Sequence, residues 1–462
     1  MRRRSVTGPL LLLLIGGLFL WRNLHPETPI FELIAQYWPF VLIAWGLLRL
    51  VEVVFTNDTR RSSFSGGEVV LMVLLCFFGW GIWEGYQHGI HIQPGGLDWF
   101  GEQYDYPISV SAPAAKMTRI VFDNPHGNVK VTGGDVQDVT VNGHKTIRAY
   151  NRNDADQTSS RTPVEIVPQG DRLLVRTNQD HAPDSQRIND DLEVTVPRAM
   201  AVESHGSSGD FDISDVTGDV ELSTNRGDVR LARLGGNARL DIGRSDLIRA
   251  SGVKGRIDLQ GRGSDVELEN VDGQVTIGGA YTGTLDFKNL SKPFQFEGAR
   301  NTEVTAVAVP GHITMDLSQL TGSGLTGPLR VVSGNRDVKL DQFTQSLDLE
   351  TQRGDIQLQP GTPMPAIEVR AASGRIELIV PDKAAFHLDA TAERGDAVND
   401  FGPGLQQESQ GHTATIRGVV GDGPAVRLTT SHGDIEIRKE SSADTESDAS
   451  KAKALKDTEV KM

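Results

Sequence analysis

Cysteine, aromatic residues and positive charge are all scarce in this sequence. Its single cysteine, Cys76, lies in an apolar run, so the rest of the chain can form no disulfide. All 6 tryptophans precede residue 100, which leaves the longer remainder without tryptophan for stacking on sugar rings. Asp and Glu number 61 against 46 Lys and Arg, and the net charge of −15 argues against a nucleic-acid partner.

Signatures of catalysis and metal binding are missing as well. We find no nucleophile elbow, phosphate-binding loop or zinc motif, and therefore assign no catalytic residue, no metal ligand and no cofactor. His88 and His91 lie three residues apart, but two ligands do not make a metal site. His126, His205 and His432 each precede a glycine, which indicates a role in turns.

Long apolar runs occur only near the N-terminus. They cover residues 6–21, 37–55 and 69–83, each near the length that a helix needs to cross a bilayer. No small-residue cleavage site follows the first run, so we predict an anchor rather than a cleaved signal peptide. Two to three transmembrane helices are expected, and the first two runs could instead form a re-entrant hairpin.

Basic residues predict the orientation of this anchor. Arg2, Arg3 and Arg4 precede the first run, and Arg60 and Arg61 separate the second from the third, whereas residues 22–36 hold one basic residue. Because basic loops stay cytoplasmic, three crossings place the C-terminal region outside. We therefore expect a multi-pass protein of the cytoplasmic (inner) membrane with an extracytoplasmic C-terminal domain.

Part of the anchor resembles a known family. Gly8-Pro9 with the following apolar run to Leu20, then Tyr37-Trp38-Pro39-Phe40 and Trp45-Gly46-Leu47, are similar to the transmembrane region of Lia-type cell-envelope stress proteins. The resemblance implies membrane attachment and a connection with envelope stress.

From about residue 112 a short unit recurs, in which Gly and a polar residue precede an apolar-x-apolar strand. Copies include Gly209-Asp210-Phe211-Asp212-Ile213, Gly218-Asp219-Val220-Glu221-Leu222 and Gly227-Asp228-Val229-Arg230-Leu231, at spacings of nine or ten residues. Such strands are too short to be stable alone and must stack on one another. The alternation predicts inward side chains at Val220, Leu222, Val229, Leu231, Ile257, Leu259, Val266 and Leu268, and outward ones at Glu221, Arg230, Asp258 and Glu267.

Alternate units share chemistry, which predicts two strands per coil. Asp210, Asp228, Asp246 and Asp265 are separated by 18, 18 and 19 residues, and Arg226, Arg244 and Arg262 by 18. We expect an Asp ladder beside an Arg ladder, with coils about 4.8 Å apart. Stacked like charges repel, so the two ladders should compensate each other or hold an ion between them.

These repeats, read over residues 107–439, resemble the putative-adhesin β-helix family of bacterial envelope proteins. The resemblance implies a function at the envelope surface and supplies no catalytic residue. The calcium-binding nonapeptide solenoids are a poorer match, because only Gly261-Arg262-Gly263-Ser264-Asp265 approaches their glycine-rich unit. Turn hydrogen bonding by Asp is the favoured interpretation.

Arginines concentrate between residues 226 and 262. We consider Arg226, Arg244, Arg262, Arg230 and Arg249 as a ladder that binds an anion or partner, against the alternative of a solvated face paired with nearby Asp. Partners would be the bilayer, an envelope polysaccharide, an anionic lipid or another envelope protein. Self-association is a further option, because solenoid ends expose strand edges.

The sequence therefore predicts an all-β soluble region folded as a right-handed β-solenoid with coils of about 18–20 residues, attached to a helical membrane anchor. We expect an anchor at 1–92, a stalk at 93–113, the solenoid at 114–439 and a disordered charged tail at 440–462. Residues 151–161 and 179–189 are expected to be polar loops, since we find no helical period beyond the anchor. The predicted function is a non-enzymatic, adhesin-like binding scaffold in envelope stress sensing; the alternative is a carbohydrate-active β-helix enzyme.

Overall fold

The computed structural model describes residues 101–183, 186–299 and 301–440, together with Phe77 and two short strands, β1 (His91–Gln93) and β2 (Gly96–Asp98). The predicted anchor crossings and the charged tail lie outside the described residues. Among the residues that are described, no helix combines the length and apolar character needed to cross a membrane. The chain divides into two compact units, and the larger comprises Pro107–Lys145, Thr162–Asp180 and Asn189–Met462.

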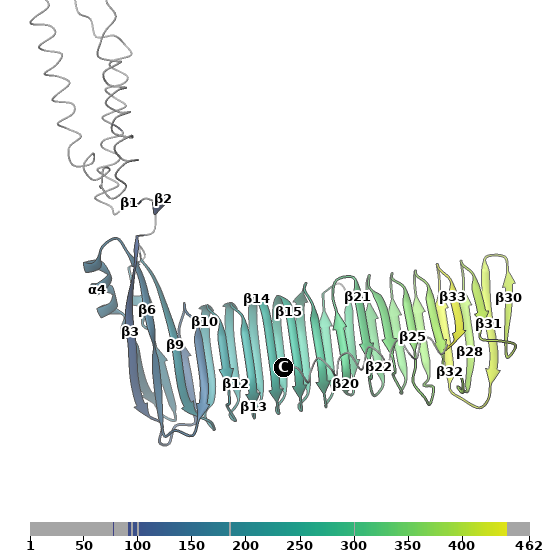
Figure 1. The fold of residues 1–462 in the computed structure, drawn as a ribbon, viewed down its shortest axis with the longest axis horizontal. Coiled ribbons are helices and arrows are strands. Elements are labelled where there is room, and N and C mark those ends of the chain that lie inside the picture. Colours follow the sequence, from purple (N-terminus) through teal and green to yellow (C-terminus); the bar gives the residue numbers. More distant parts are fainter. Residues whose placement is uncertain are drawn as a thin grey trace, which may run out of the picture. The chain divides into compact units, whose positions relative to one another are not determined.

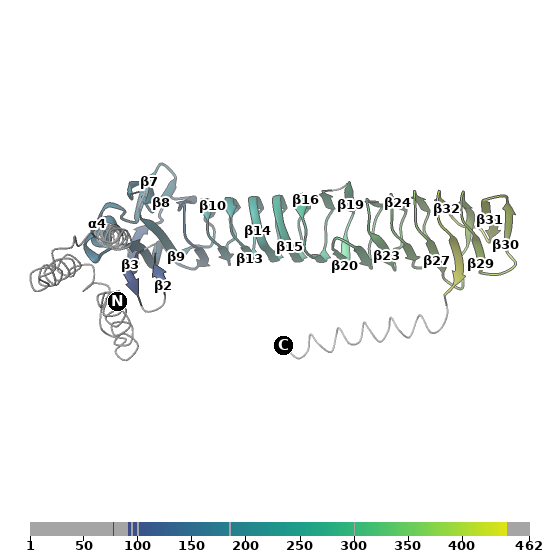
Figure 2. The same cartoon turned by 90° about the horizontal axis from the view of Figure 1, so that it is seen from above.

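The larger unit is a β-solenoid with two strands in each coil (Figure 1). Val202 pairs with Val220 and Val220 with Ala238, so each coil repeats after 18 residues here, and Ala238 pairs with Ile257 after 19. The two strands of successive coils form two stacks, which Figure 2 shows from above.

Stack 1 contains, in spatial order, β7 (Glu165–Gln169), β8 (Arg172–Arg176), β4 (Arg119–Asp123), β10 (Ala201–Ser208), β12 (Val220–Arg226), the first parts of β14 (Ala238–Val253) and β15 (Ile257–Val271), β16 (Val275–Tyr281), β18 (Phe294–Gly298), β19 (Thr302–Ala306), β22 (Leu329–Ser333), β24 (Leu347–Thr351), β26 (Ile367–Ala371), β32 (Ala425–Thr430), β28 (Phe386–Ala392), β31 (Thr413–Val420) and β30 (Leu405–Gln410).

Stack 2 contains β3 (Glu102–Pro113), β6 (Asp138–Ala149), β9 (Arg187–Pro197), β5 (Val129–Gly134), β11 (Phe211–Ser214), β13 (Val229–Leu234), the second parts of β14 and β15, β17 (Leu285–Leu290), β20 (Val309–Met315), β21 (Gln319–Ser323), β23 (Asp337–Asp341), β25 (Ile356–Gln359), β27 (Ile376–Val380), β33 (Ile435–Lys439) and β29 (Ala397–Asp400). Residues 102–113, which the sequence assigns to a stalk, thus form β3.

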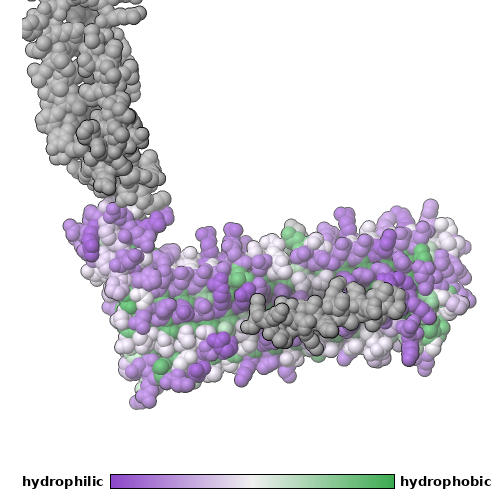
Figure 3. Space-filling view, in the orientation of Figure 1, coloured by the Kyte–Doolittle hydropathy of each residue, from purple (hydrophilic) through white to green (hydrophobic). Residues whose placement is uncertain are grey.

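The core lies between the two stacks and follows the predicted alternation. Each of the eight side chains expected to point inward is at most 2% exposed: Val220, Leu222, Val229, Leu231, Ile257, Leu259, Val266 and Leu268. The outer faces carry the polar partners of this alternation, and hydrophilic residues dominate the face that Figure 3 shows. Burial of one apolar layer per coil stabilises strands that are too short to be stable alone.

Chain order and spatial order differ at both ends of the solenoid. The coil β4–β5 lies between the coils β8–β9 and β10–β11, although it precedes both in the sequence. In the same way the last coil, β32–β33, lies between β26–β27 and β28–β29. The segment β6–β9 therefore lies at the N-terminal end of the solenoid, and the segment β28–β31 lies at its C-terminal end.

One coil runs against the rest. Strands β19 and β20 pair antiparallel with the strands on both sides, whereas the coils before and after them pair in parallel. The Gly-Asp unit is missing from the sequence between Gly283 and Gly334, and the reversed coil falls in that gap. Phe287 packs in the core just before it, 4.8 Å from Phe294 between ring centroids.

At the C-terminal end the hairpin β30–β31 extends stack 1. Phe401 packs edge-on against Phe386 at a centroid distance of 5.4 Å. The Asn399 side chain holds this loop, since its amide donates to the carbonyls of Gly402 and Leu405 and its oxygen accepts the Phe401 N–H.

The smaller unit corrects one sequence prediction. Residues 151–161 were expected as a loop, but α4 (Arg152–Arg161) is a helix, and the 3-10 turn η1 (Gln179–His181) lies in the second insertion. Asn151 caps α4, because its side-chain oxygen accepts the Asp154 N–H at 2.9 Å. Ala155 packs in a small core with Ile147. A ten-residue helix with so few apolar positions has a weak period, which explains the error.

Candidate ligand-binding groove

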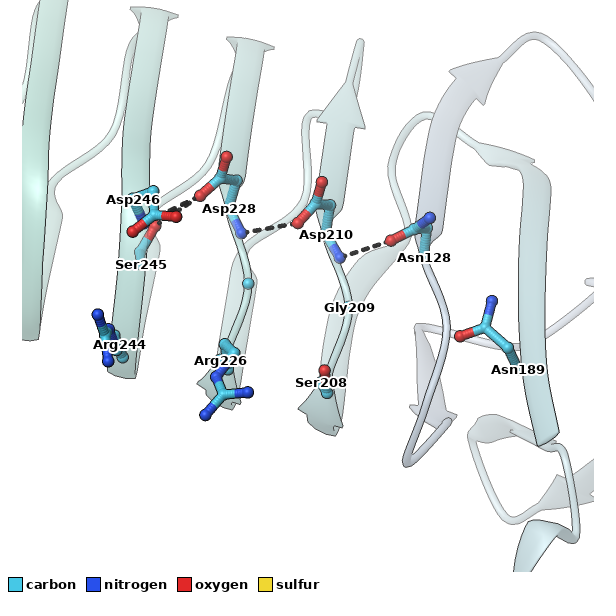
Figure 4. Close-up of a pocket in the computed structure, with 11 residues that line it drawn as sticks. Asn128, Asn189, Ser208, Gly209, Asp210, Arg226, Asp228, Arg244, Ser245 and Asp246 are labelled. Atoms are coloured by element: carbon cyan, nitrogen blue, oxygen red, sulfur yellow. Dashed lines mark hydrogen bonds between the residues drawn. The ribbon is translucent and has the colours of Figure 1, made fainter. Parts of the chain in front are cut away.

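Side-chain oxygens connect successive coils at one corner of the solenoid. The backbone N–H of Asn128 donates to Asp191 Oδ1 at 2.8 Å, and that of Asp210 donates to Asn128 Oδ1 at 2.8 Å. Asp228 N–H then donates to Asp210 Oδ1 at 2.9 Å, and Asp246 N–H to Asp228 Oδ1 at 3.0 Å. Each bond spans one coil, and Figure 4 shows those between Asn128 and Asp246. One side-chain oxygen per coil thus satisfies a corner N–H that no strand partner reaches.

The same bond recurs at other corners, with either Asp or Asn as the acceptor. It joins Asp219 to the N–H of Asn237, Asn237 to Arg256, Asp265 to Thr284, Asp337 to Asp355, Asp355 to Arg375, and Asp434 to Asp396. Asn serves as well as Asp, so the bond requires an oxygen and not a charge.

Asp246 is the exception among the four aspartates singled out in the sequence. Between Ile242 and Ser245 the register of β14 against β15 shifts: Ile242 pairs with Gly261, whereas Ser245 pairs with Gly263. Two residues, Gly243 and Arg244, thus oppose one, which is a β-bulge. Within the described residues no hydrogen bond or ion pair involves the Asp246 carboxylate, so the ladder stops there.

Beside the aspartates lies a row of arginines, and the two rows enclose an open groove of about 660 Å³. Its lining includes Asp210, Asp228 and Asp246 on one side and Arg226 and Arg244 on the other (Figure 4). Both arginines are exposed, and no acid of the described chain lies within ion-pairing distance of either guanidinium. Arg262 continues the row one coil beyond.

Corner glycines keep the space between the two rows open. Gly209 and Gly227 have φ of 152° and 153°, a region that side chains disfavour. A Cβ at Gly227 would lie 1.8 Å from the Gly209 carbonyl oxygen. The floor of the groove is therefore bare backbone.

The remaining two arginines of the predicted ladder lie elsewhere. Arg230 and Arg249 pair with each other across the outer face of stack 2, as like charges on adjacent coils. Arg249 donates to Glu267 at 2.6 Å, and Arg230 lies 3.9 Å from Asp228, so both are compensated. The hydrogen bond that Arg249 donates to Glu267 raises the pKa of Arg249.

The sequence Arg-Gly-Asp occurs at three corners, at residues 226–228, 353–355 and 394–396. At the first, Arg244 lies one coil beyond Arg226, whereas Ser373 takes that place beside the second. At the third, the Arg394 guanidinium contacts His432 Nε2 at 3.0 Å.

Sequence analysis missed a buried ion pair near the N-terminal end of the solenoid. Lys145 Nζ lies 3.6 Å from Asp190 Oδ1, and both side chains are almost fully buried. Thr162 accepts from the ammonium, and Gln179 donates to Asp190 Oδ2 at 2.7 Å. Burial lowers the pKa of Lys145 and raises that of Asp190. A lone Lys and Asp 45 residues apart give no sequence signal.

The groove offers hydrogen bonds and charges of both signs. Its lining contains three carboxylates and two guanidiniums, a formal sum of −1 (2 − 3), with Asn128, Asn189, Ser208 and Ser245 as neutral polar groups. Over the described residues, no three His, Cys, Asp or Glu side chains gather as metal ligands. Such a lining can recognise a polar, charged ligand.

The soluble region matches the family model described as Toastrack DUF4097 over residues 117–438, and residues 7–97 match the LiaF transmembrane domain. A comparison with curated proteins found no match.

Solved structures similar to the chain include a putative cell adhesion protein from Clostridium sporogenes, with 6% identity over 73% of this chain and 100% of the other, and a TM-score of 0.17. A putative adhesin from Bacteroides fragilis shares 11% identity over 72% of this chain and 97% of its own, with a TM-score of 0.21. A putative adhesin from Parabacteroides distasonis shares 12% identity over 73% of this chain and 97% of its own, with a TM-score of 0.20. The match over 117–438 shows that the chain belongs to the Toastrack DUF4097 family, joined to a LiaF-type transmembrane domain.

Proposed function

We propose that this protein is a multi-pass protein of the cytoplasmic membrane whose right-handed β-solenoid is extracytoplasmic and binds an envelope component without catalysing a reaction. The ligand would be a glycan, a lipid or another envelope protein, and binding would report on the state of the envelope. The family match supports membrane attachment through a LiaF-type domain.

The observation that carries this proposal is the pair of unpaired, exposed arginines, Arg226 and Arg244, held one coil apart beside the aspartate ladder. The ladder bonds fix the corner backbone, so little ordering entropy is lost when a ligand binds there. A guanidinium without a carboxylate partner is free to form charge-assisted bonds with an incoming anionic group.

The carbohydrate-active alternative has less support from the groove. Asp228 Oδ1 accepts two backbone N–H groups and lies 3.3 Å from the Ser245 hydroxyl, which is the environment of a structural acceptor rather than of a general base. Among the described lining residues there is no aromatic ring to carry a sugar.

Membrane orientation is tested by labelling. With Cys76→Ser as background, the variant Ser346→Cys carries a single thiol on the exposed surface of the solenoid. We expect an impermeant maleimide to label Ser346→Cys in intact cells or spheroplasts. Labelling only after lysis would place the solenoid in the cytoplasm and overturn the proposal.

The binding role is tested by crosslinking in cells. The full-length protein and the variant Arg226→Ser/Arg244→Ser/Arg262→Ser are crosslinked and purified, and bound glycans, lipids and proteins are identified. The matched control is Arg239→Ser/Arg353→Ser/Arg427→Ser, which removes three exposed arginines outside the groove. We expect the first variant to lose a partner that the control retains. Equal recovery from both variants would contradict a binding role for this groove.

A further inference from the structure

The charges that line the groove do not suit a polyanion. Three carboxylates face two guanidiniums, so a ligand with negative charge alone would meet as much repulsion as attraction. A ligand that fits must present both an anionic and a cationic group. The two rows define where each group would lie.

On the anionic side, two unpaired arginines lie on adjacent coils. Coils are about 4.8 Å apart, so Arg226 and Arg244 can donate together to the oxygens of one phosphate. The β-bulge contains Arg244, and bulges commonly re-aim a side chain next to a functional site.

On the cationic side, the carboxylates are not equally available. Asp228 is occupied by the N–H groups of Asp246 and Leu247, and Asp210 retains one oxygen beyond its ladder bond. Asp246 has both oxygens uncommitted within the described structure, because the bulge interrupts the ladder there. An ammonium group would therefore be held at Asp246.

We propose that the groove binds a phosphate–ammonium zwitterion of the phosphoethanolamine type, with its phosphate between Arg226 and Arg244 and its ammonium on Asp246. This inference rests on the proposed function and specifies its ligand. Arg244 and Asp246 are two residues apart on one strand, about 6.6 Å along the backbone, a span that long side chains and a two-carbon linker bridge. The bare glycine floor gives the ligand access to both rows.

The test uses the full-length protein in a maltoside detergent at low ionic strength, with calorimetric titration of three probes: phosphoethanolamine, inorganic phosphate and ethanolamine. We expect phosphoethanolamine to bind at least about tenfold more tightly than either single-charge probe, since each of those loses one charged contact. Equal affinity for phosphate, or no saturable binding of phosphoethanolamine, overturns the proposal.

Two variants separate the roles of the rows. Arg244→Gln should weaken both phosphoethanolamine and phosphate about tenfold. Asp246→Asn should weaken phosphoethanolamine about tenfold but leave phosphate binding unchanged or stronger, because it removes both the ammonium contact and a repulsive charge. The Asp246 carboxylate accepts no ladder bond, and its backbone N–H still donates to Asp228 Oδ1, so this substitution spares the coil contacts.

The matched controls are Arg239→Gln and Asp241→Asn, an exposed pair with the same spacing on the same strand but outside the groove. They should change neither affinity by more than about twofold. If Asp246→Asn weakens phosphate and phosphoethanolamine alike, the assignment of an ammonium site is wrong.

Vesicle binding distinguishes a lipid headgroup from a non-lipid carrier as the source of the phosphoethanolamine group. With the protein in nanodiscs, co-sedimentation with vesicles of phosphatidylethanolamine and phosphatidylglycerol, but not of phosphatidylglycerol alone, identifies a lipid headgroup if Arg244→Gln abolishes it. Binding of soluble phosphoethanolamine without co-sedimentation identifies a non-lipid carrier. If both fail while the triple arginine variant still loses its cellular partner, the scaffold function stands and the zwitterion is wrong.

Discussion

Asp210 Oδ1 accepts the backbone N–H of Asp228, 18 residues further along the chain, at 2.9 Å. This bond explains how aspartates of like charge can stack at the spacing of neighbouring coils. The sequence suggests compensation by an arginine ladder or an ion, whereas at Asp210 and Asp228 the compensation comes from backbone N–H donors. The arginines beside them remain available for other contacts.

If the ladder needs an oxygen rather than a charge, Asp228→Asn should be tolerated and Asp228→Ala should not. Asn128 and Asn237 already serve as natural acceptors. We expect Asp228→Ala to lower the free energy of unfolding by about 1–3 kcal/mol, because the backbone N–H groups of Asp246 and Leu247 lose their acceptor. Thermal unfolding of the full-length protein measures this. A loss as large for Asp228→Asn as for Asp228→Ala would show that charge matters.

Corner glycines should be intolerant of a side chain. In Gly227→Ala the new Cβ would overlap the Gly209 carbonyl oxygen, and φ at 227 is 153°. We expect a loss of about 1–3 kcal/mol or failure to fold. Gly134→Ala is the control, because its Cβ would meet only side-chain carbons at 3.5 Å. Equal unfolding temperatures for the two variants would refute the corner argument.

Breaking the buried Lys145–Asp190 pair should be costly. Lys145→Met leaves the Asp190 carboxylate buried with Gln179 as its remaining donor, and we expect a loss of about 3–5 kcal/mol. The double variant Lys145→Met/Asp190→Asn should recover part of it, because no charge is left buried. Denaturant unfolding provides both values, and a single variant within about 1 kcal/mol of the parent would contradict the expected penalty.

The Arg119–Glu203 ion pair should make the stability of the protein depend on pH in the acidic range. The hydrogen bond from Arg119 lowers the pKa of Glu203 below its usual value. The stabilisation is therefore complete above the unfolded pKa of about 4.3 and is lost as the pH falls through the lower folded pKa.

Glu203→Gln should lose about 1 kcal/mol near neutral pH and show a shallower decline in unfolding temperature below about pH 4.3. Glu350→Gln, at an exposed position of β24, is the control and should follow the parent curve. Parallel curves for parent and Glu203→Gln would exclude this pair as a source of the pH dependence.

Local pattern predicted much of the fold. The nine-residue repeat gives the strand positions, the alternation gives inward residues such as Val229 and Leu231, and the pairing of alternate units gives a register of 18 residues. These features are predictable because each depends on a few neighbouring residues and one strand period. For the groove, the sequence placed Arg226 and Arg244 in one row but also grouped Arg230 and Arg249 with them, on a face that proves separate.

Taken alone, the sequence determined that short Gly-Asp strands stack in coils with an apolar interior, because no such strand is stable without neighbours. Only the tertiary structure decided which coil lies beside which: similar coils can stack in several orders, so the burial of coil β4–β5 and the reversal at β19–β20 depend on contacts distant in sequence. The same holds for the bulge at Arg244. A one-residue shift between two coils interrupts the ladder and leaves the Asp246 carboxylate without a ladder bond. The repeat period alone does not predict which strand contains the extra residue.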